Sequence, residues 1–338
     1  MPNTASPPET ILAASSPRRS RLSHALSQNV GLALVIALLI ACILLYCVLY
    51  IVTQHRLPGG FELTSTLDNT MPLAFAALAQ TLVVLTRGID LSVGGVIDLT
   101  NAVAAQTLMG GPVATTLWTI AILLIGALCG LVNGVLVAIG RLQPILVTLS
   151  TLSIFQGIAI KILPQPGGAM PPGFTAVLAN PNVPLSLIYI PIIGILWAIF
   201  RRTSLGVAVY AVGNDAMAAS SHGISVRRTT ILAYMLGGVA SACAGLFLAA
   251  NATAGDATTG DTYTLTSIVA AVLGGVSLFG GRGSGLGALF GAFVTVMVVN
   301  ILFFAHIDPL YQTFYEGLFL LAAVVAANII GQIVRRRR

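Results

Sequence analysis

Long apolar runs, separated by short polar segments, recur along the whole chain. Each run is about 20 residues long without apolar/polar alternation, which fits a helix crossing a bilayer rather than a barrel strand. The pattern therefore predicts an all-α, polytopic membrane protein with about ten transmembrane helices. The expected spans are 29–53, 70–87, 91–110, 114–140, 143–163, 184–201, 229–251, 263–281, 284–305 and 310–333.

The runs divide the chain into one membrane domain with two tails. Residues 1–28 are polar and rich in Pro, Ser and Ala, and we expect a disordered cytosolic tail there. The apolar run that follows is too long for the core of a signal peptide, so it is interpreted as the first span. Residues 29–333 form a single transmembrane domain in this interpretation, and 334–338 form a basic C-terminal tail.

Composition and charge support this interpretation and give an orientation. The chain is 57% hydrophobic and 8% charged, with a formal net charge of +6. With ten spans, every Lys and Arg except Arg56 and Lys161 falls on the side of the two termini. Basic residues concentrate in cytoplasmic loops. Both termini are therefore predicted to be cytoplasmic, and the positive charge needs no nucleic-acid partner.

The polar segments on the two predicted sides differ in character. Residues 55–70, 164–174 and 252–263 have the Gly, Pro, Thr and Asp content of loops. They place four acidic residues outside: Glu62, Asp68, Asp256 and Asp261. The inner segment 201–230 contains an Ala-rich stretch that could form one short helix. It is too small to be an enzyme and is suited to docking another protein.

Small residues mark the expected helix contacts. Four-residue spacing places glycines on one helix face, where backbones can approach closely. Two such series occur: Gly126, Gly130 and Gly134, and Gly283, Gly287 and Gly291. The cysteines lack metal-ligand spacing and are interpreted as packing residues: Cys42, Cys47, Cys129 and Cys243. The segment "GGRGSGLG" lacks the Lys-Ser/Thr of a phosphate-binding loop.

Two acidic residues in "RGIDLSVGGVIDLT" (87–100) call for different explanations. Arg87 is expected at the C-terminal end of one helix and Asp90 at the N-cap of the next, each complementing the local helix dipole. Asp90 is thus a cap, with a role in gating or coupling as the alternative. Asp98 lies about 12 Å deeper along the helix and cannot be a cap.

A carboxyl at the depth of Asp98 is costly and marks a functional-site hypothesis. The structural alternative is a hydrogen bond between helices, to Asn133 or Gln156. Glu316 in the last expected span poses the same question. Both carboxyls keep open a self-contained secondary transporter, coupled to protons or sodium. A membrane scaffold without a transport path is disfavoured by these intramembrane polar residues.

Five blocks of sequence resemble the permease subunits of bacterial sugar ABC importers of the ribose/xylose/galactose type, and more distantly branched-chain amino-acid permeases. The likeness runs from about residue 70 to 325. The blocks are "RGIDLSVGGV" (87–96), "GLVNGVLVA" (130–138), "LQPILVTLSTL" (142–152), "YAVGNDAMAASSHGISV" (210–226) and "SIVAAVLGGVSLFGGRGSGLGALFGA" (267–292).

The resemblance implies a membrane-spanning permease subunit of an ATP-driven importer, moving a small hydrophilic solute, in particular a monosaccharide, across a bacterial inner membrane. The chain itself would not be an enzyme and would hold no cofactor, because ATP and Mg would bind to separate ATPase subunits. The other implied partners are an extracytoplasmic sugar-binding protein and a second permease subunit, the same or a homologous chain.

The resemblance also assigns roles along the chain. The segment at about 204–226 would couple to the ATPase through Asn214, Ala218, Ala219 and Gly223. The outer residues Asp256 and Asp261 would meet the binding protein. We expect the translocation pathway among Asp98, Asn101, Gln106, Thr148, Ser150 and Gln156.

Overall fold

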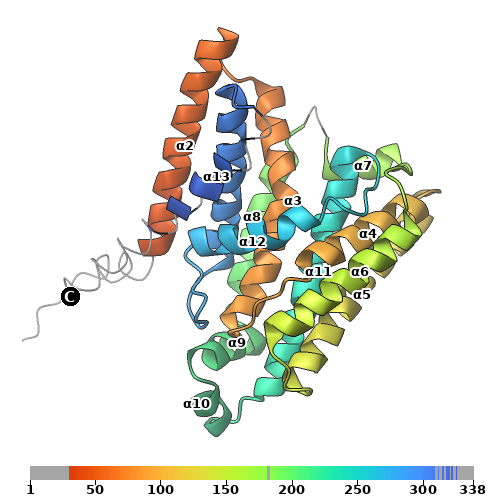
Figure 1. The fold of residues 1–338 in the computed structure, drawn as a ribbon, viewed down its shortest axis with the longest axis vertical. Helices are drawn as coiled ribbons and strands as arrows, with labels where there is room; N and C mark the ends of the chain where they lie inside the picture. The colour runs from red at the N-terminus through yellow and green to blue at the C-terminus, as the bar shows by residue number, and fades with distance from the viewer. Residues whose placement is uncertain are drawn as a thin grey trace, which may run out of the picture.

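The computed structural model describes residues 30–180 and 183–308 and, between 311 and 325, residues 311, 314, 315, 317–319, 321, 322 and 325. The named elements in these residues are all helices (Figure 1). They are α2 (Val30–Gln54), α3 (Gly60–Leu85), α4 (Val93–Thr107), α5 (Pro112–Ala138), α6 (Pro144–Ile162), α7 (Pro172–Leu178), α8 (Ser186–Phe200), α9 (Ser204–Asn214), α10 (Ala216–Ser221), α11 (Val226–Ala252), α12 (Asp261–Leu273) and α13 (Gly285–Phe304).

Each of the first nine expected spans overlaps one of these helices. Six described helices are long and apolar enough to cross a membrane, or seven if α8 and α9, bent by 74°, form one broken span. The chain is thus an all-helical, multi-pass protein in its described part. The tails 1–28 and 334–338 and Glu316 lie outside the described residues, and the tenth span, 310–333, is described only in fragments.

Two of the expected spans are short helices inside the bundle. α4 has 15 residues and is buried from Val93 to Ala105, and α12 has 13 residues. Non-helical backbone is tolerated at membrane depth when protein surrounds it. These helices can therefore end early, with their flanking loops packed against neighbouring helices.

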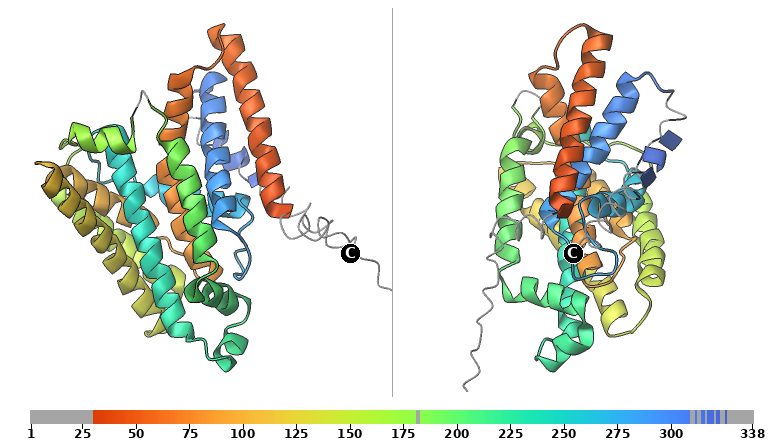
Figure 2. Two further views of the ribbon diagram at one scale, coloured as in Figure 1. Left: turned by 180° about the vertical axis from the view of Figure 1, so that it is seen from behind. Right: turned by 90° about the vertical axis from the view of Figure 1, so that its left-hand side faces the viewer.

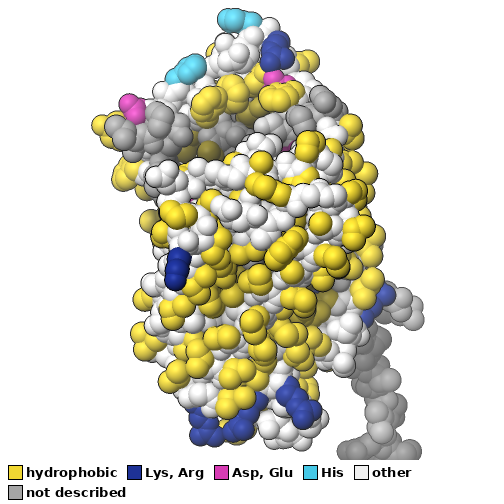
Figure 3. Space-filling model, turned by 90° about the vertical axis from the view of Figure 1, so that its right-hand side faces the viewer, with side chains coloured by type: hydrophobic (Ala, Val, Ile, Leu, Met, Phe, Trp, Pro, Cys, Tyr) yellow, Lys and Arg dark blue, Asp and Glu magenta, His cyan; other side chains and the backbone are white. Residues whose placement is uncertain are grey.

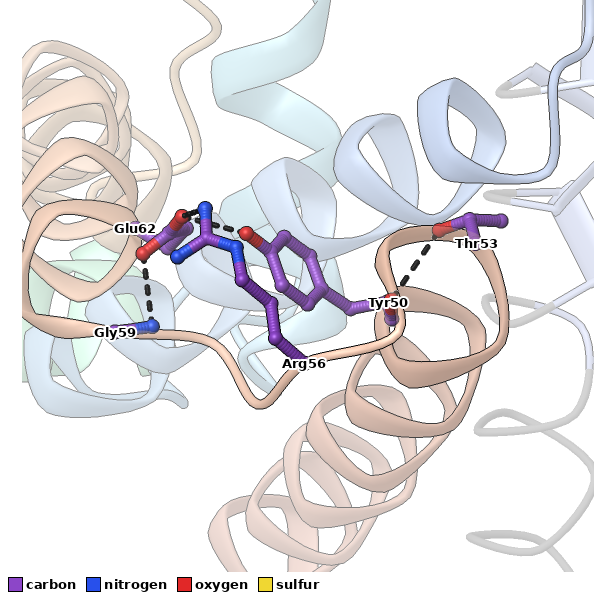
Figure 4. A network of polar contacts seen from close by, with 5 residues as sticks. All are labelled: Tyr50, Thr53, Arg56, Gly59 and Glu62. Atoms are coloured by element: carbon purple, nitrogen blue, oxygen red, sulfur yellow. Dashed lines mark hydrogen bonds and ion pairs between the residues drawn. The ribbon is translucent and has the colours of Figure 1, made fainter.

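The expected outer loop at 55–70 is wrong, because most of it is helix. α3 begins at Gly60, ten residues before the expected span. Glu62 accepts hydrogen bonds from the Tyr50 hydroxyl at 2.5 Å, the Arg56 guanidinium at 2.6 Å and the Gly59 N–H at 2.8 Å (Figure 4). The polar composition of this segment therefore marks a capped helix start. Asp68, expected outside, is buried inside the bundle.

The helices pack as two groups that meet along α11. Figures 1 and 2 show α2 beside α13 at one edge of the molecule and α5 beside α6 at the other. α11 packs against α5 and α4 in one group and against α3 in the other. α9 and α10 project from one end of the bundle, shown at the bottom of Figure 1.

Glycine contacts bring α5 and α11 together. A Cβ at Gly126 would lie 2.4 Å from the Gly238 carbonyl oxygen, and one at Gly130 would lie 2.1 Å from the Tyr234 carbonyl oxygen. The first predicted glycine series is therefore a packing face. In the second series Gly287 and Gly291 contact α12 in the same way, whereas Gly283 lies in the preceding loop.

The cysteine interpretation agrees with the structure. The thiols are free, and each is buried or half-buried: Cys42, Cys47, Cys129 and Cys243.

Replacing Gly130 by Ala should destabilise the protein by about 1–3 kcal/mol, because the added methyl overpacks the α5–α11 contact. Gly157→Ala is the matched control, since a Cβ there meets nothing within 4 Å. Thermal unfolding of the purified protein in detergent measures both. Equal melting temperatures for the two variants would contradict the close-packed interface.

Candidate functional site

The residues singled out in the sequence gather at the two ends of the bundle. One group surrounds the 253–260 loop before α12, and the other surrounds α9 and α10. Figure 3 shows a broad apolar belt between the ends, and Lys and Arg side chains gather at the end that carries α9 and α10.

Asp98 anchors the loop that leads into α12. Its side chain is fully buried on α4, and its Oδ1 accepts a hydrogen bond from the Gly260 N–H at 2.6 Å. The expected partners, Asn133 and Gln156, are therefore wrong, because the loop folds onto α4 and supplies a backbone donor instead. The Asp98 Oδ2 and the buried Thr264 hydroxyl have no hydrogen-bond partner among the described residues.

Two more predicted pathway residues hold the same end of the bundle. The Asn101 Oδ1 accepts from the Asp256 N–H at 2.8 Å. The Gln156 Nε2 donates to the Asp261 Oδ2 at 2.7 Å, which joins α6 to the start of α12. Residues predicted separately for the pathway and for protein docking are thus direct neighbours.

The Asp256 carboxylate is the charged group of the loop itself. The Thr258 hydroxyl and the Thr258 N–H donate to it at 2.8 and 2.9 Å. These hydrogen bonds hold the pKa of Asp256 below its usual range. The loop therefore carries a negative charge at neutral pH.

The remaining predicted pathway residues lie apart from this group. Thr148 is at the other end of the bundle, where its hydroxyl accepts from the Leu91 N–H at 3.0 Å. Ser150 is exposed and donates to its own helix, to the Leu146 carbonyl at 2.8 Å. Gln106 is exposed near the end of α4. The structure thus brings together three of the six residues: Asp98, Asn101 and Gln156.

Two further buried polar side chains were not predicted from the sequence. Asp68 accepts from the Ser186 hydroxyl at 2.5 Å, and its carbonyl accepts from the Asn251 side chain at 2.9 Å. Gln80 is fully buried on α3, and its side-chain amide has no partner among the described residues. The depth argument applied to Asp98 could have found Gln80, which interrupts an apolar run.

At the opposite end, Arg87 binds the end of α9. Its Nε donates to the Gly213 carbonyl at 2.8 Å and its Nη2 to the Asn214 carbonyl at 2.6 Å. Arg87 thus lies at the C-terminal end of α3 as expected, but its guanidinium binds the carbonyls that end α9 rather than those of its own helix. Arg87 has a left-handed backbone (φ 68°), which turns its side chain toward the neighbouring segment.

Asp90 stabilises the turn before α4 but is not its N-cap. The N-cap is Ser92, and the Asp90 Oδ1 accepts from the Ser92 N–H at 2.9 Å and the Ser92 hydroxyl at 2.6 Å. Asn133 on α5 donates to the same hydroxyl at 2.7 Å. The turn is therefore tied to α5 through a buried polar chain.

The Ala-rich stretch forms the short helix α10, as the sequence predicts. Asp215 caps it by accepting from the N–H groups of Ala218 at 3.0 Å and Met217 at 2.8 Å, which hold the pKa of this carboxyl below its usual range. Asn214, Ala218 and Gly223 are exposed, and Ala219 is buried. The segment is thus an ordered, accessible projection.

Comparison with known proteins gives a consistent result. Residues 63–327 match the family model described as branched-chain amino acid transport system / permease component. The chain is 33% identical to a ribose import permease protein of Haemophilus influenzae, over 80% of this chain and 86% of the relative. It is 35% identical to a fructose import permease protein of Rhizobium meliloti, over 79% of this chain and 77% of the relative.

A third relative is an autoinducer 2 import system permease protein of Enterobacter sp. (strain 638), 33% identical over 79% of this chain and 78% of that protein. No solved structure matches the chain. The family match includes both polar groups and α9–α10, whereas α2 lies outside it.

Arg87→Ala should loosen α9 and α10, because charge-assisted hydrogen bonds contribute about 1.5–3 kcal/mol each. Hydrogen–deuterium exchange should show faster amide exchange across 204–221, by about tenfold or more. Arg228→Ala is the control, an exposed arginine at the same end. Unchanged exchange in Arg87→Ala would contradict the anchoring role.

Asp98→Ala should lower the free energy of unfolding by about 1–3 kcal/mol, because it leaves the buried Gly260 N–H without an acceptor. Asp98→Asn keeps a carbonyl oxygen at that position and should unfold close to the wild-type temperature. Thermal unfolding compares the two. If Asn is as harmful as Ala, the carboxylate has a role beyond accepting this hydrogen bond.

Proposed function

The chain belongs to the branched-chain amino acid transport system / permease component family, and we propose on that premise that it is the membrane-spanning permease subunit of an ATP-driven importer. The observation that carries the proposal is the family match over 63–327, which spans both polar groups. Two of the relatives are import permeases for ribose and fructose, which supports a monosaccharide as the solute. They favour a permease subunit over a self-contained transporter coupled through Asp98.

The end that carries α9 and α10 is proposed to face the cytoplasm. The arginines gathered there support this orientation through the positive-inside rule: Arg87, Arg141, Arg201, Arg202, Arg227, Arg228 and Arg282. In the full proposal the chain has ten spans and both termini are cytoplasmic. The membrane is then the inner membrane of a bacterium.

α9 and α10 are proposed to couple the permease to a cytosolic ATPase subunit. The small exposed residues of the segment allow a partner surface to approach its backbone, notably Ala218 and Gly223. Arg87 and Asn214 anchor the segment to the membrane bundle, so a displacement of α10 would be transmitted to α3. ATP and Mg would bind in the ATPase, and this chain would hold no cofactor.

The solute pathway is proposed along the exposed polar face of α6 and α12. Polar side chains exposed within an otherwise apolar belt are costly against lipid, and they favour an aqueous pathway or a partner subunit. Those of α6 and α12 are the exposed Ser150, Ser153, Asp261 and Thr262, with the half-buried Gln156 and Thr266 beside them. A second permease subunit, the same or a homologous chain, would complete the pathway opposite this face.

The other predicted pathway residues take supporting positions in this proposal. Asp98 and Asn101 are buried behind the face and hold the 253–260 loop. Gln106 extends the lining toward the outer end of α4, and Thr148 stabilises the turn at the inner end. The charged Asp256 and the exposed Asp261 would meet the extracytoplasmic sugar-binding protein.

Copurification tests the proposal directly. The full chain, isolated in mild detergent from its native cells, should bring down an ATPase subunit that is identified by mass spectrometry. Ala218→Arg should reduce its recovery at least tenfold, because a charged side chain blocks close approach to α10. Leu57→Arg is the matched control, an exposed apolar residue between α2 and α3 at the other end.

Transport separates the proposal from its alternative. Liposomes that hold the copurified complex should take up a monosaccharide only with ATP and the binding protein present. Uptake by the isolated chain without ATP, lost in Asp98→Asn, would instead establish a secondary transporter.

A further inference from the structure

The loop between α12 and α13 presents an apolar tip at the end that carries α9 and α10. The Gly280 N–H donates to the Ser277 carbonyl at 2.9 Å, which closes a four-residue turn. Its two central residues are Leu278 and Phe279, exposed to 45% and 87%. Central turn positions usually hold polar residues, Gly or Pro. Two large apolar residues there need an explanation.

Backbone hydrogen bonds fix the tip to the rest of the fold. The Gly281 N–H donates to the Leu85 carbonyl at 3.0 Å, and the Ser277 N–H donates to the Arg282 carbonyl at 2.9 Å. Gly281 adopts a left-handed backbone (φ 67°) that a larger residue would strain. The side chain of Phe279 is therefore held outward by a fixed loop.

The tip and the α9–α10 segment form one unit. The Asn214 side chain donates to the Gly281 carbonyl at 3.3 Å, and the Tyr210 hydroxyl donates to the Gly283 carbonyl at 2.8 Å. A Cβ at Gly213 would lie 2.5 Å from the Gly281 nitrogen. A protein that binds α10 would therefore also meet the tip, because hydrogen bonds hold the two segments together.

The location of the tip argues against lipid as its partner. Phe279 at 87% and Met217 at 81% are the most exposed large hydrophobic side chains in the described part of the chain. Both belong to the end that carries α9 and α10, since Met217 is in α10 and the tip is hydrogen-bonded to Leu85 and Asn214; Lys and Arg side chains gather at this end (Figure 3). Exposed arginines accompany them, namely Arg282 beside the tip and Arg201 and Arg202 before α9.

We propose that Leu278 and Phe279 are a second docking contact for the cytosolic ATPase subunit, beside the α9–α10 segment. The proposal rests on the proposed function and adds a contact to it. The matching surface of the ATPase would be an apolar hollow with acidic side chains at its rim, complementary to the arginines. Phe279 would be its central anchor, since buried aromatic side chains carry a large share of interface affinity.

The experiment measures binding of the copurified ATPase subunit to the full-length permease in nanodiscs. Phe279→Ser should weaken binding about tenfold to thirtyfold, as expected for the loss of an aromatic anchor. Phe61→Ser is the matched control, a phenylalanine exposed to 67% in the first turn of α3 at the other end. The permease melting temperature should not change in either variant.

The outcomes distinguish this proposal from the proposed function. If Ala218→Arg abolishes binding and Phe279→Ser leaves it unchanged, the second contact is wrong and the importer function stands. If no ATPase binds the wild type, the proposed function itself fails. Two further results would overturn the contact: quenching of a Phe279→Trp variant by brominated lipid without ATPase, or a changed oligomeric state of Phe279→Ser alone.

Discussion

Backbone groups that leave a helix inside the bundle must find partners, because neither lipid nor apolar side chains can supply them. This constraint explains where the buried polar side chains lie. Asp98 and Asn101 accept the N–H groups of Gly260 and Asp256, so the loop before α12 can lie inside the bundle. Thr148 accepts the Leu91 N–H in the turn before α4. The short helices α4 and α12 depend on these contacts.

The same constraint acts on carbonyl groups at the opposite end. Arg87 binds the final carbonyls of α9, and Asn214 binds the carbonyl of Gly281 in the loop before α13. Three segments far apart in sequence thus share one set of hydrogen bonds: the α3–α4 turn, α9–α10 and the α12–α13 loop. In the proposed importer subunit, such a unit would connect a cytosolic surface mechanically to the membrane helices.

Close helix packing complements these hydrogen bonds. Gly126 and Gly130 let α5 approach α11, and Gly287 and Gly291 let α13 approach α12. Such contacts are sensitive to added volume, because a helix backbone can move only as a whole. In the proposed importer, the exposed polar side chains of α6 and α12 would face the second subunit.

The sequence by itself determined the helical class, the positions of nine helices and the packing role of Gly126 and Gly130, because apolar length and glycine spacing are local signals. Tertiary structure decided the partners of Asp98, Asp90 and Arg87. No local pattern indicated that a loop more than 150 residues beyond Asp98 would fold onto it. The early start of α3 was also not predicted, because Glu62 lies in a segment of loop composition. Only the tertiary structure places Tyr50 and Arg56 where they bind its carboxylate. Local pattern thus predicts which segments are helices, whereas the partner of a buried polar group depends on contacts distant in sequence.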